Sequence, residues 1–239
     1  MSITIGISIG DPNGIGPEVV LKTFADSEML SVCTPIIYAH LDFVNQQAGH
    51  FDLQLPIDRM HDQPKQGVLN VVDCWTVPFQ PQYGEVDLKA GELSVKSLVA
   101  ATADLKNKNI NALVTAPIHK AAIQSEDFRF PGHTNYLAQA FNGDALMFLV
   151  HPDLRIALVT DHVAVKDIAR HITSDRVAQK LRAVAHSLQQ DFGISNPHIA
   201  VLGLNPHAGD EGVIGEEEVN MIEPLLQTHQ IDKTEISGP

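Results

Sequence analysis

Short apolar runs alternate with amphipathic stretches along the first half of the chain. The runs are rich in Ile, Val and Leu, as is typical of strands buried in a parallel sheet; they are Ile3–Ile9, Pro35–Ala39, Val68–Val72 and Leu113–Thr115. Between them, Leu41–Gly49 and Gly91–Asn107 have the spacing of helices, and the second carries an apolar face made of Val95, Leu98, Val99 and Leu105. Prolines interrupt residues 51–66, which predicts irregular structure there. Strands that alternate with helices predict an α/β fold with a mostly parallel sheet.

The second half of the chain has a different pattern. Ala145–Val150 and Arg155–Thr160 flank a short turn and predict an antiparallel hairpin. Ser174–Asp191 predicts a long helix capped by Ser174, with an apolar stripe formed by Val177, Leu181, Val184, Ala185 and Leu188. Ile199–Leu202 predicts another buried parallel strand, and Glu216–His229 predicts a final helix whose first glutamates suit the positive helix start.

Length and composition allow two lobes and exclude some partners. The 239 residues are 44% hydrophobic, so the chain is long enough for two small lobes, which we place at residues 1–127 and 128–239. A net charge of −13 argues against nucleic acid as a partner. No run approaches the roughly 20 apolar residues of a membrane helix, and Ile3–Ile9 is too short for a signal peptide. The cysteines Cys33 and Cys74 form neither a disulfide framework nor a zinc-binding spacing, so we expect a cytoplasmic protein that binds no membrane.

Two loops in the first half carry candidate ligand-binding residues at predicted strand ends, where open α/β sheets bind ligands. Gly10–Glu18 contains Gly14 and Gly16, which let the backbone approach a ligand beside a helix start. Its spacing matches neither a dinucleotide fingerprint nor a P-loop, so an ordinary strand-to-helix turn is the alternative. Lys120 follows Leu113–Thr115 and could contact a phosphate or carboxylate, with a solvated lysine as the equal alternative.

Three histidines complete the set of candidate residues. His133 and Thr134 precede a predicted helix through Tyr136–Phe141 and could clamp an anion, although Thr134 as a helix cap is the simpler explanation. His162 follows one predicted strand, and His207 lies in the Gly-rich loop that follows another. Taken singly, His162 is more often a hydrogen-bonded structural residue, and the loop of His207 is equally well explained as a sharp surface turn.

These loops occur in the same order as in a known family. The chain resembles the 4-hydroxythreonine-4-phosphate dehydrogenases, which are related to the isocitrate and isopropylmalate dehydrogenases. The motifs that carry the resemblance are Gly10–Glu18, Thr115–Lys120, Pro131–Thr134, Leu158–His162 and Gly203–Gly215. Each motif is weak alone, whereas five in one order are not expected by chance. The chain has His119 where the family usually has Asn, and Asn135 where it usually has Glu.

The resemblance implies an activity. The family oxidises and decarboxylates 4-phosphohydroxy-L-threonine to an amino-ketone phosphate, using NAD or NADP and a divalent metal, in pyridoxal phosphate biosynthesis. The implied substrate-binding residues are His133, Thr134 and Lys120, the implied cofactor-binding residues are Gly14 and Gly16, and the implied metal ligands are His162 and His207. Imidazoles suit Zn, Co or Mn and are less typical for Mg, and a firm site needs a third ligand. Asp161 could orient one imidazole, with a surface aspartate as the equal alternative, and no general base is identified. The resemblance also implies two α/β/α lobes with interleaved elements and a homodimer with a shared active site.

Family members continue beyond the position of Pro239, by resemblance. The further segment carries a third metal histidine, several substrate contacts and part of the dinucleotide site, so we expect this chain to be the front part of the enzyme. Met60–Gln63 is similar to that segment's Tyr-His-Asp-Gln motif but lies far too early, so His61 is expected to be a solvated loop residue.

Other functions remain open from the sequence. One is a catalytically silent relative that keeps phosphate-ligand binding. Another is a dehydrogenase of a different four-carbon phosphorylated hydroxy acid. A third, a metal-dependent hydrolase, rests on the histidines alone.

Overall fold

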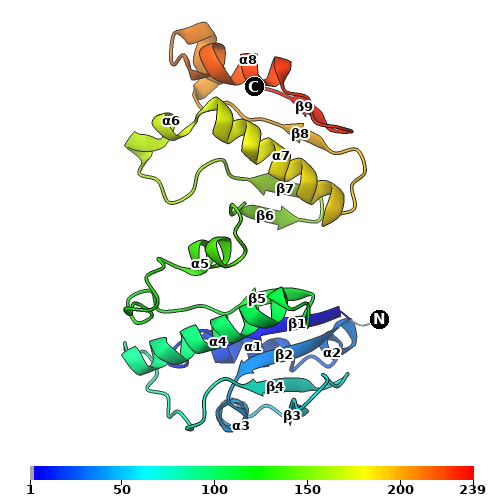
Figure 1. Ribbon diagram of the computed structural model, residues 1–239, viewed down its shortest axis with the longest axis vertical. Coiled ribbons are helices and arrows are strands. Elements are labelled where there is room, and N and C mark those ends of the chain that lie inside the picture. The colour runs from blue at the N-terminus through cyan, green and yellow to red at the C-terminus, as the bar shows by residue number, and fades with distance from the viewer. Residues whose placement is uncertain (1–2) are drawn as a thin grey trace. The chain divides into compact units, whose positions relative to one another are not determined.

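The computed structural model describes residues 3–239, which divide into two compact units, Met1–Ala145 and Leu146–Pro239 (Figure 1). The predicted lobe boundary after residue 127 stays a prediction. Within residues 3–239, every helix is too short or too polar to span a lipid bilayer.

The first unit is built on a five-stranded, entirely parallel sheet with the order β3-β4-β2-β1-β5. The strands are β1 (Ile3–Ser8), β2 (Cys33–Ala39), β3 (Ile57–Arg59), β4 (Leu69–Asp73) and β5 (Ala112–Thr115). The predicted α/β fold with a mostly parallel sheet is confirmed. The prediction of irregular structure for residues 51–66 was wrong at β3, because three residues at a sheet edge are too few to show a period.

Helices cover both faces of this sheet (Figure 1). They are α1 (Gly16–Thr23), α2 (Met29–Val32), α3 (Leu41–His50) and α4 (Leu88–Lys106). A fifth helix, α5 (His133–Ala140), lies away from the sheet, and its Tyr136 packs against Phe128 (Figure 1). Successive side chains of a strand point to opposite faces. Accordingly, Ile37 of β2 packs in the cluster that includes residues of α1 and α3, while Tyr38 packs in the cluster that includes Ala101 of α4.

The apolar face predicted for α4 is partly wrong. Leu98 is buried, whereas Val99 is 45% exposed. Neighbouring residues of a helix lie about 100° apart, so only one of the pair can face the sheet. The helix begins at Leu88, earlier than predicted, because Asp87 caps it by accepting a hydrogen bond from the Lys89 amide at 2.8 Å.

The second unit contains two separate two-stranded sheets. β6 (Phe148–His151) and β7 (Leu154–Ala157) form an antiparallel hairpin, so that prediction is confirmed with shorter strands. β8 (His198–Ala200) pairs in parallel with β9 (Glu235–Ser237). β8 was predicted to be buried, but Ile199 is half-buried and its two neighbours in the strand are exposed. The reason is that β8 pairs with a single short strand.

One helix of the second unit follows the apolar pattern of the sequence closely. The helical elements of this unit are η1 (Val165–Asp167), α6 (Ile168–His171), α7 (Ser174–Gln190), η2 (Pro206–Gly212), η3 (Glu218–Ile222) and α8 (Glu223–Thr228). The stripe of α7 buries Val177, Leu181, Ala185 and Leu188 as predicted, whereas Val184 is only half-buried. The predicted cap was wrong: Thr173, not Ser174, accepts from the Arg176 amide at 3.3 Å. The predicted final helix is a π-helical turn followed by α8.

Candidate functional site

The Gly-rich loop after β1 lies against the loop after β5. The Asp11 amide donates to the Pro117 carbonyl oxygen at 2.8 Å. Gly10 has a φ of +73°, and a Cβ there would lie 2.3 Å from the same oxygen. A side chain at position 10 is therefore excluded both by its backbone conformation and by space. Two of the predicted ligand loops thus contact each other at the carboxyl edge of the sheet.

Gly14 and Gly16 have different surroundings within this loop. A Cβ on buried Gly16 would lie 2.5 Å from the Ile9 carbonyl oxygen, so its lack of a side chain allows α1 to start close to β1. Gly14 is half-buried, and its amide donates to the Asp11 carbonyl oxygen at 3.0 Å. Packing therefore explains Gly16, and cofactor binding by the two glycines stays a prediction.

Asn13 organises this loop, and sequence reasoning missed it. Its side chain is buried, accepts a hydrogen bond from the Gln82 amide at 2.8 Å and donates to the Glu85 carbonyl oxygen at 3.2 Å. Its own carbonyl accepts from the Gly84 amide at 3.1 Å. Asn13 thereby holds residues 82–85 beside the Gly-rich loop. The Asp-Pro-Asn-Gly turn around it was a visible signal, but its partners lie about 70 positions away.

Lys120 and the segment before α5 are tied together by one amide side chain. The Gln124 side chain donates to the Lys120 carbonyl oxygen at 3.3 Å and to the Phe130 carbonyl oxygen at 2.8 Å. Aromatic packing adds to this link, since the Phe128 and Tyr136 rings lie 5.3 Å apart between centroids. The Lys120 side chain is exposed. The structure therefore places Lys120, His133 and Thr134 in one connected part of the first unit.

His133 is the first residue of α5 and has an unpartnered nitrogen. Its Nε2 atom is buried and has no hydrogen-bond partner within residues 3–239. Burial lowers the pKa of His133 below its ordinary value, so the imidazole is neutral at neutral pH. Gly132 occupies the N-cap position without a side-chain cap, and Thr134 lies inside the helix, so the helix-cap explanation for Thr134 was wrong. His133 Nε2 thus has neither a hydrogen-bond partner within residues 3–239 nor contact with solvent, and substrate binding by His133 stays a prediction.

The loop that carries His207 has an unusual backbone. Residues 207–211 all have positive φ, from +50° at Asp210 to +81° at Gly209. This left-handed region is sparsely populated by residues other than glycine and is common at functional sites. A Cβ on Gly209 would lie 2.3 Å from the Gly215 carbonyl oxygen, so the loop closes tightly on itself. The His207 side chain is exposed.

Glu218 anchors this loop from inside. Its carboxylate accepts hydrogen bonds from the Asn205 amide at 2.7 Å and from the Asn205 side chain at 2.8 Å. Burial raises the pKa of Glu218, but the hydrogen bonds from Asn205 and nearby backbone outweigh this effect and hold the pKa below its ordinary value. The sequence showed three consecutive glutamates, and nothing in it marked the third as the buried one.

His162 and His207 both lie in the second unit as exposed imidazoles. His162 has a φ of +51°, and its Nδ1 lies 3.5 Å from the Asp161 carboxylate, the geometry in which Asp161 could orient the ring. Within residues 3–239, no group of three or more His, Cys, Asp or Glu side chains could hold a metal ion. The metal pair therefore stays a prediction. His61 is exposed in its loop, as expected.

Known proteins match this chain along most of its length. Residues 31–239 match the sequence profile described as pyridoxal phosphate biosynthetic protein PdxA. A 4-hydroxythreonine-4-phosphate dehydrogenase of Bacteroides thetaiotaomicron is 42% identical over 229 residues, which are 94% of this chain and 63% of that protein. The chain therefore spans less than two thirds of the length of that relative.

Solved structures agree on the fold. The crystal structure of a 4-hydroxythreonine-4-phosphate dehydrogenase from Burkholderia phymatum superposes with a TM-score of 0.85 at 30% identity, covering 100% of this chain and 74% of that one. A terephthalate 1,2-cis-dihydrodiol dehydrogenase from Burkholderia xenovorans has a TM-score of 0.67 at 25% identity, again covering 100% of this chain and 74% of that one. The resemblance inferred from the motifs is confirmed. The chain belongs to the family of the pyridoxal phosphate biosynthetic protein PdxA.

Proposed function

We propose that this chain serves the metal-dependent, NAD- or NADP-linked oxidation and decarboxylation of 4-phosphohydroxy-L-threonine to an amino-ketone phosphate, a step of pyridoxal phosphate biosynthesis. The match of residues 31–239 to the family profile carries the proposal. The name of the relative that is 42% identical supports the same substrate.

Substrate binding is assigned to the first unit. His133 offers a buried, unpartnered Nε2 at the start of an eight-residue helix, where helix N–H groups also favour an anion. The exposed Lys120 adds a positive charge on a segment that Gln124 ties to the approach of α5. Together with the Thr134 hydroxyl, these groups would bind the phosphate of the substrate.

Cofactor binding is assigned to the Gly-rich loop after β1. Gly14 and Gly16 would let a nicotinamide dinucleotide approach the backbone, and Asn13 would keep the loop in place through its bonds to residues 82–85. When bound, the nicotinamide accepts the hydride from the secondary alcohol.

Metal binding is assigned to His162 and His207. Exposed imidazoles fit Zn, Co or Mn, and Asp161 would hold the His162 ring. When bound, a divalent cation supplies Lewis-acid polarisation of the oxygen atoms that coordinate it. Two imidazoles are fewer than the three protein ligands of a catalytic zinc site, so the proposal needs a further ligand.

We also propose a homodimer whose subunits share the active site. The β6–β7 hairpin leaves Leu149, Val150 and Leu154 each more than half exposed, and exposed apolar groups of this kind mark interaction surfaces. Sedimentation of the wild-type protein and of Val150→Asp would test this. We expect a dimer whose dissociation constant rises at least tenfold in the variant, and a wild-type monomer at micromolar concentration would reject the dimer.

Enzyme assays test the activity directly. The protein is mixed with 4-phosphohydroxy-L-threonine, NAD or NADP, and Zn, Co, Mn or Mg, and both nicotinamide reduction and carbon dioxide release are followed. We expect both signals to depend on the substrate and the metal. Thermal stabilisation by the substrate without nicotinamide reduction would instead identify a silent binding protein.

A dehydrogenase of another four-carbon phosphorylated hydroxy acid is the second candidate. His119 and Asn135 depart from the usual family residues beside Lys120 and Thr134, which are assigned to the substrate. The terephthalate dihydrodiol dehydrogenase indicates that the fold serves other substrates. The ratio of kcat/KM for threonate and erythronate phosphates to that for 4-phosphohydroxy-L-threonine decides between the candidates.

A further inference from the structure

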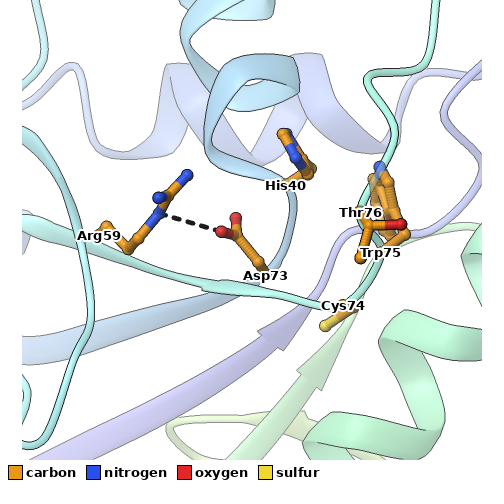
Figure 2. A pocket seen from close by; sticks show the side chains of 6 residues that line it. All are labelled: His40, Arg59, Asp73, Cys74, Trp75 and Thr76. Atoms are coloured by element: carbon orange, nitrogen blue, oxygen red, sulfur yellow. Dashed lines mark ion pairs between the residues drawn. The ribbon is translucent and has the colours of Figure 1, made fainter.

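A pocket of about 410 Å³ lies at the carboxyl ends of three strands of the first unit (Figure 2). It is lined by His40, Arg59, Asp73, Cys74, Trp75 and Thr76. Arg59 and Asp73 end β3 and β4, and His40 directly follows β2. The Gly-rich loop and the Lys120 loop follow β1 and β5, at the opposite end of the strand order. The pocket therefore shares no residue with the substrate, cofactor or metal positions proposed above.

The ion pair between Arg59 and Asp73 leaves hydrogen-bond donors of Arg59 without a protein partner within residues 3–239. Arg59 Nε lies 2.9 Å from the Asp73 carboxylate, as the dashed line in Figure 2 shows. The second Asp73 oxygen accepts a hydrogen bond from the Leu41 amide at 2.8 Å. Both oxygens of Asp73 are thus engaged, whereas the terminal nitrogens of Arg59 have no partner within residues 3–239. A guanidinium with free terminal nitrogens can still bind a planar anion.

Two aromatic side chains add further donors. His40 Nδ1 accepts a hydrogen bond from the Asp42 amide at 3.2 Å, so the neutral ring carries its proton on Nε2. Trp75 is 7% exposed, and its buried indole N–H has no hydrogen-bond partner within residues 3–239. A buried hydrogen-bond donor without a partner costs free energy, so its presence calls for a structural or functional explanation. The two rings are stacked, 22° from parallel with centroids 6.4 Å apart, and both line the pocket.

The charge balance selects the class of ligand. Arg59 is neutralised by Asp73, so the pocket presents several donors and little net charge. Burial, followed by the nearby Asp73 and Asp104 carboxylates, raises the pKa of the Cys74 thiol to about 12, so it adds no negative charge. A phosphate dianion would face the Asp73 carboxylate without a compensating cation, whereas a monoanion needs only the donors.

We propose that this pocket binds a small organic monocarboxylate. Its carboxylate would accept hydrogen bonds from the terminal nitrogens of Arg59 and from His40 Nε2–H, and its apolar body would lie against the Trp75 side chain. Pockets of a few hundred cubic ångströms with an apolar wall and a few polar groups are typical of small-molecule sites.

Trp75 makes the test direct because it is the one tryptophan of the chain. Benzoate is titrated into the protein while tryptophan fluorescence is recorded, with benzamide and inorganic phosphate as comparison probes. We expect a saturable change with benzoate and none with the other two. Arg59→Gln should raise the dissociation constant at least tenfold, and Arg129→Gln, which changes an exposed arginine of the same unit, should leave it unchanged.

A second variant keeps the test decisive if Arg59→Gln does not fold. His40→Asn keeps a residue suited to cap α3 but removes the Nε2–H donor, so it should also weaken benzoate binding several-fold. Thermal melts of each variant show whether it is folded. No saturable change in the wild type, equal binding of benzamide or phosphate, or wild-type affinity in a folded Arg59→Gln or His40→Asn protein would overturn the proposal.

Discussion

The two units of the chain maintain their structures in different ways. Within residues 3–239, all three clusters of buried apolar side chains belong to Met1–Ala145. The buried apolar side chains described in the second unit are instead five residues of α7 and Ile222; the five are Val177, Ala178, Leu181, Ala185 and Leu188. The first unit therefore owes its stability to a sheet buried on both faces, which the second unit lacks.

A buried carboxylate anchors one loop of the second unit, which exposes many apolar side chains. Glu218, which is fully buried, holds the His207 loop through Asn205, while apolar side chains such as Val165 and Val213 are more than 80% exposed. A parallel sheet with helices on both faces can be a stable scaffold by itself, whereas a unit with exposed apolar groups and a buried carboxylate depends on exact hydrogen bonding and on partners. The proposed metal ligands His162 and His207 therefore lie in the unit that buries fewer apolar side chains.

The largest effect is expected from the core of the first unit. Phe43 is 1% exposed and packs against the Trp75 and Phe79 rings. Phe43→Ala should lower the free energy of unfolding by about 3–5 kcal/mol. Val165→Ala, at a side chain of the second unit that is 87% exposed, should change it by less than about 0.5 kcal/mol. Urea titrations followed by Trp75 fluorescence and by circular dichroism measure both, and equal losses would remove the contrast between the units.

The next effect concerns activity. His207→Ala should abolish tight binding of Zn or Co and, in an active preparation, lower kcat/KM at least 100-fold, on the order of 2.7 kcal/mol of transition-state stabilisation. The reason is that it removes one ligand from an incomplete set. His61→Ala, which changes an exposed loop histidine of the first unit, is the matched control and should alter neither quantity. Normal metal content and turnover in His207→Ala would contradict the metal assignment.

Close packing of the His207 loop predicts an intermediate effect. Gly209 and Gly193 both have positive φ, +81° and +68°, but only Gly209 lacks room for a Cβ. Both alanine variants incur the cost of the left-handed conformation, about 1–2 kcal/mol. Gly209→Ala should exceed Gly193→Ala by about 1–3 kcal/mol because of overpacking. Thermal unfolding of the pair measures the difference, and equal melting temperatures would show that the loop opens easily.

The smallest effect concerns Glu218 and depends on pH. Its pKa in the folded protein is below the ordinary value, so the unfolded chain binds a proton more readily. The stability that Glu218 contributes is therefore complete above the ordinary glutamate pKa of about 4.3 and is lost as pH falls through the folded pKa. Glu218→Gln should cost about 1 kcal/mol at neutral pH, and less as the pH drops below about 4.

Glu216→Gln is the control for this measurement, because Glu216 is exposed two positions earlier in the same glutamate run. It should change the free energy of unfolding by no more than about 0.5 kcal/mol. A pH-independent loss in Glu218→Gln would show that size and shape, and not the charge of the carboxylate, hold the loop.

The sequence by itself determined the elements whose burial has a regular period. It located β1, β2, β4 and β5, the helices α3 and α7, and the class of the fold, because apolar side chains recur along each segment at the spacing of its structure. It also placed the Gly10–Glu18 loop and the loop of Lys120 after strands, and the structure has them after β1 and β5. Ligand binding by these loops stays a prediction. The signal failed at β3 and at the half-exposed β8, where short edge strands bury too little to leave a pattern.

Only the tertiary structure decided which distant residues meet. The bond of Asn13 to Gln82 joins positions about 70 apart, and burial selects Glu218 from three neighbouring glutamates. The pocket of His40, Arg59 and Trp75 likewise exists because β2, β4 and β3 are neighbours in the sheet. Local propensity cannot encode such contacts, since each depends on strand pairing and on the loss of water around groups that are far apart along the chain.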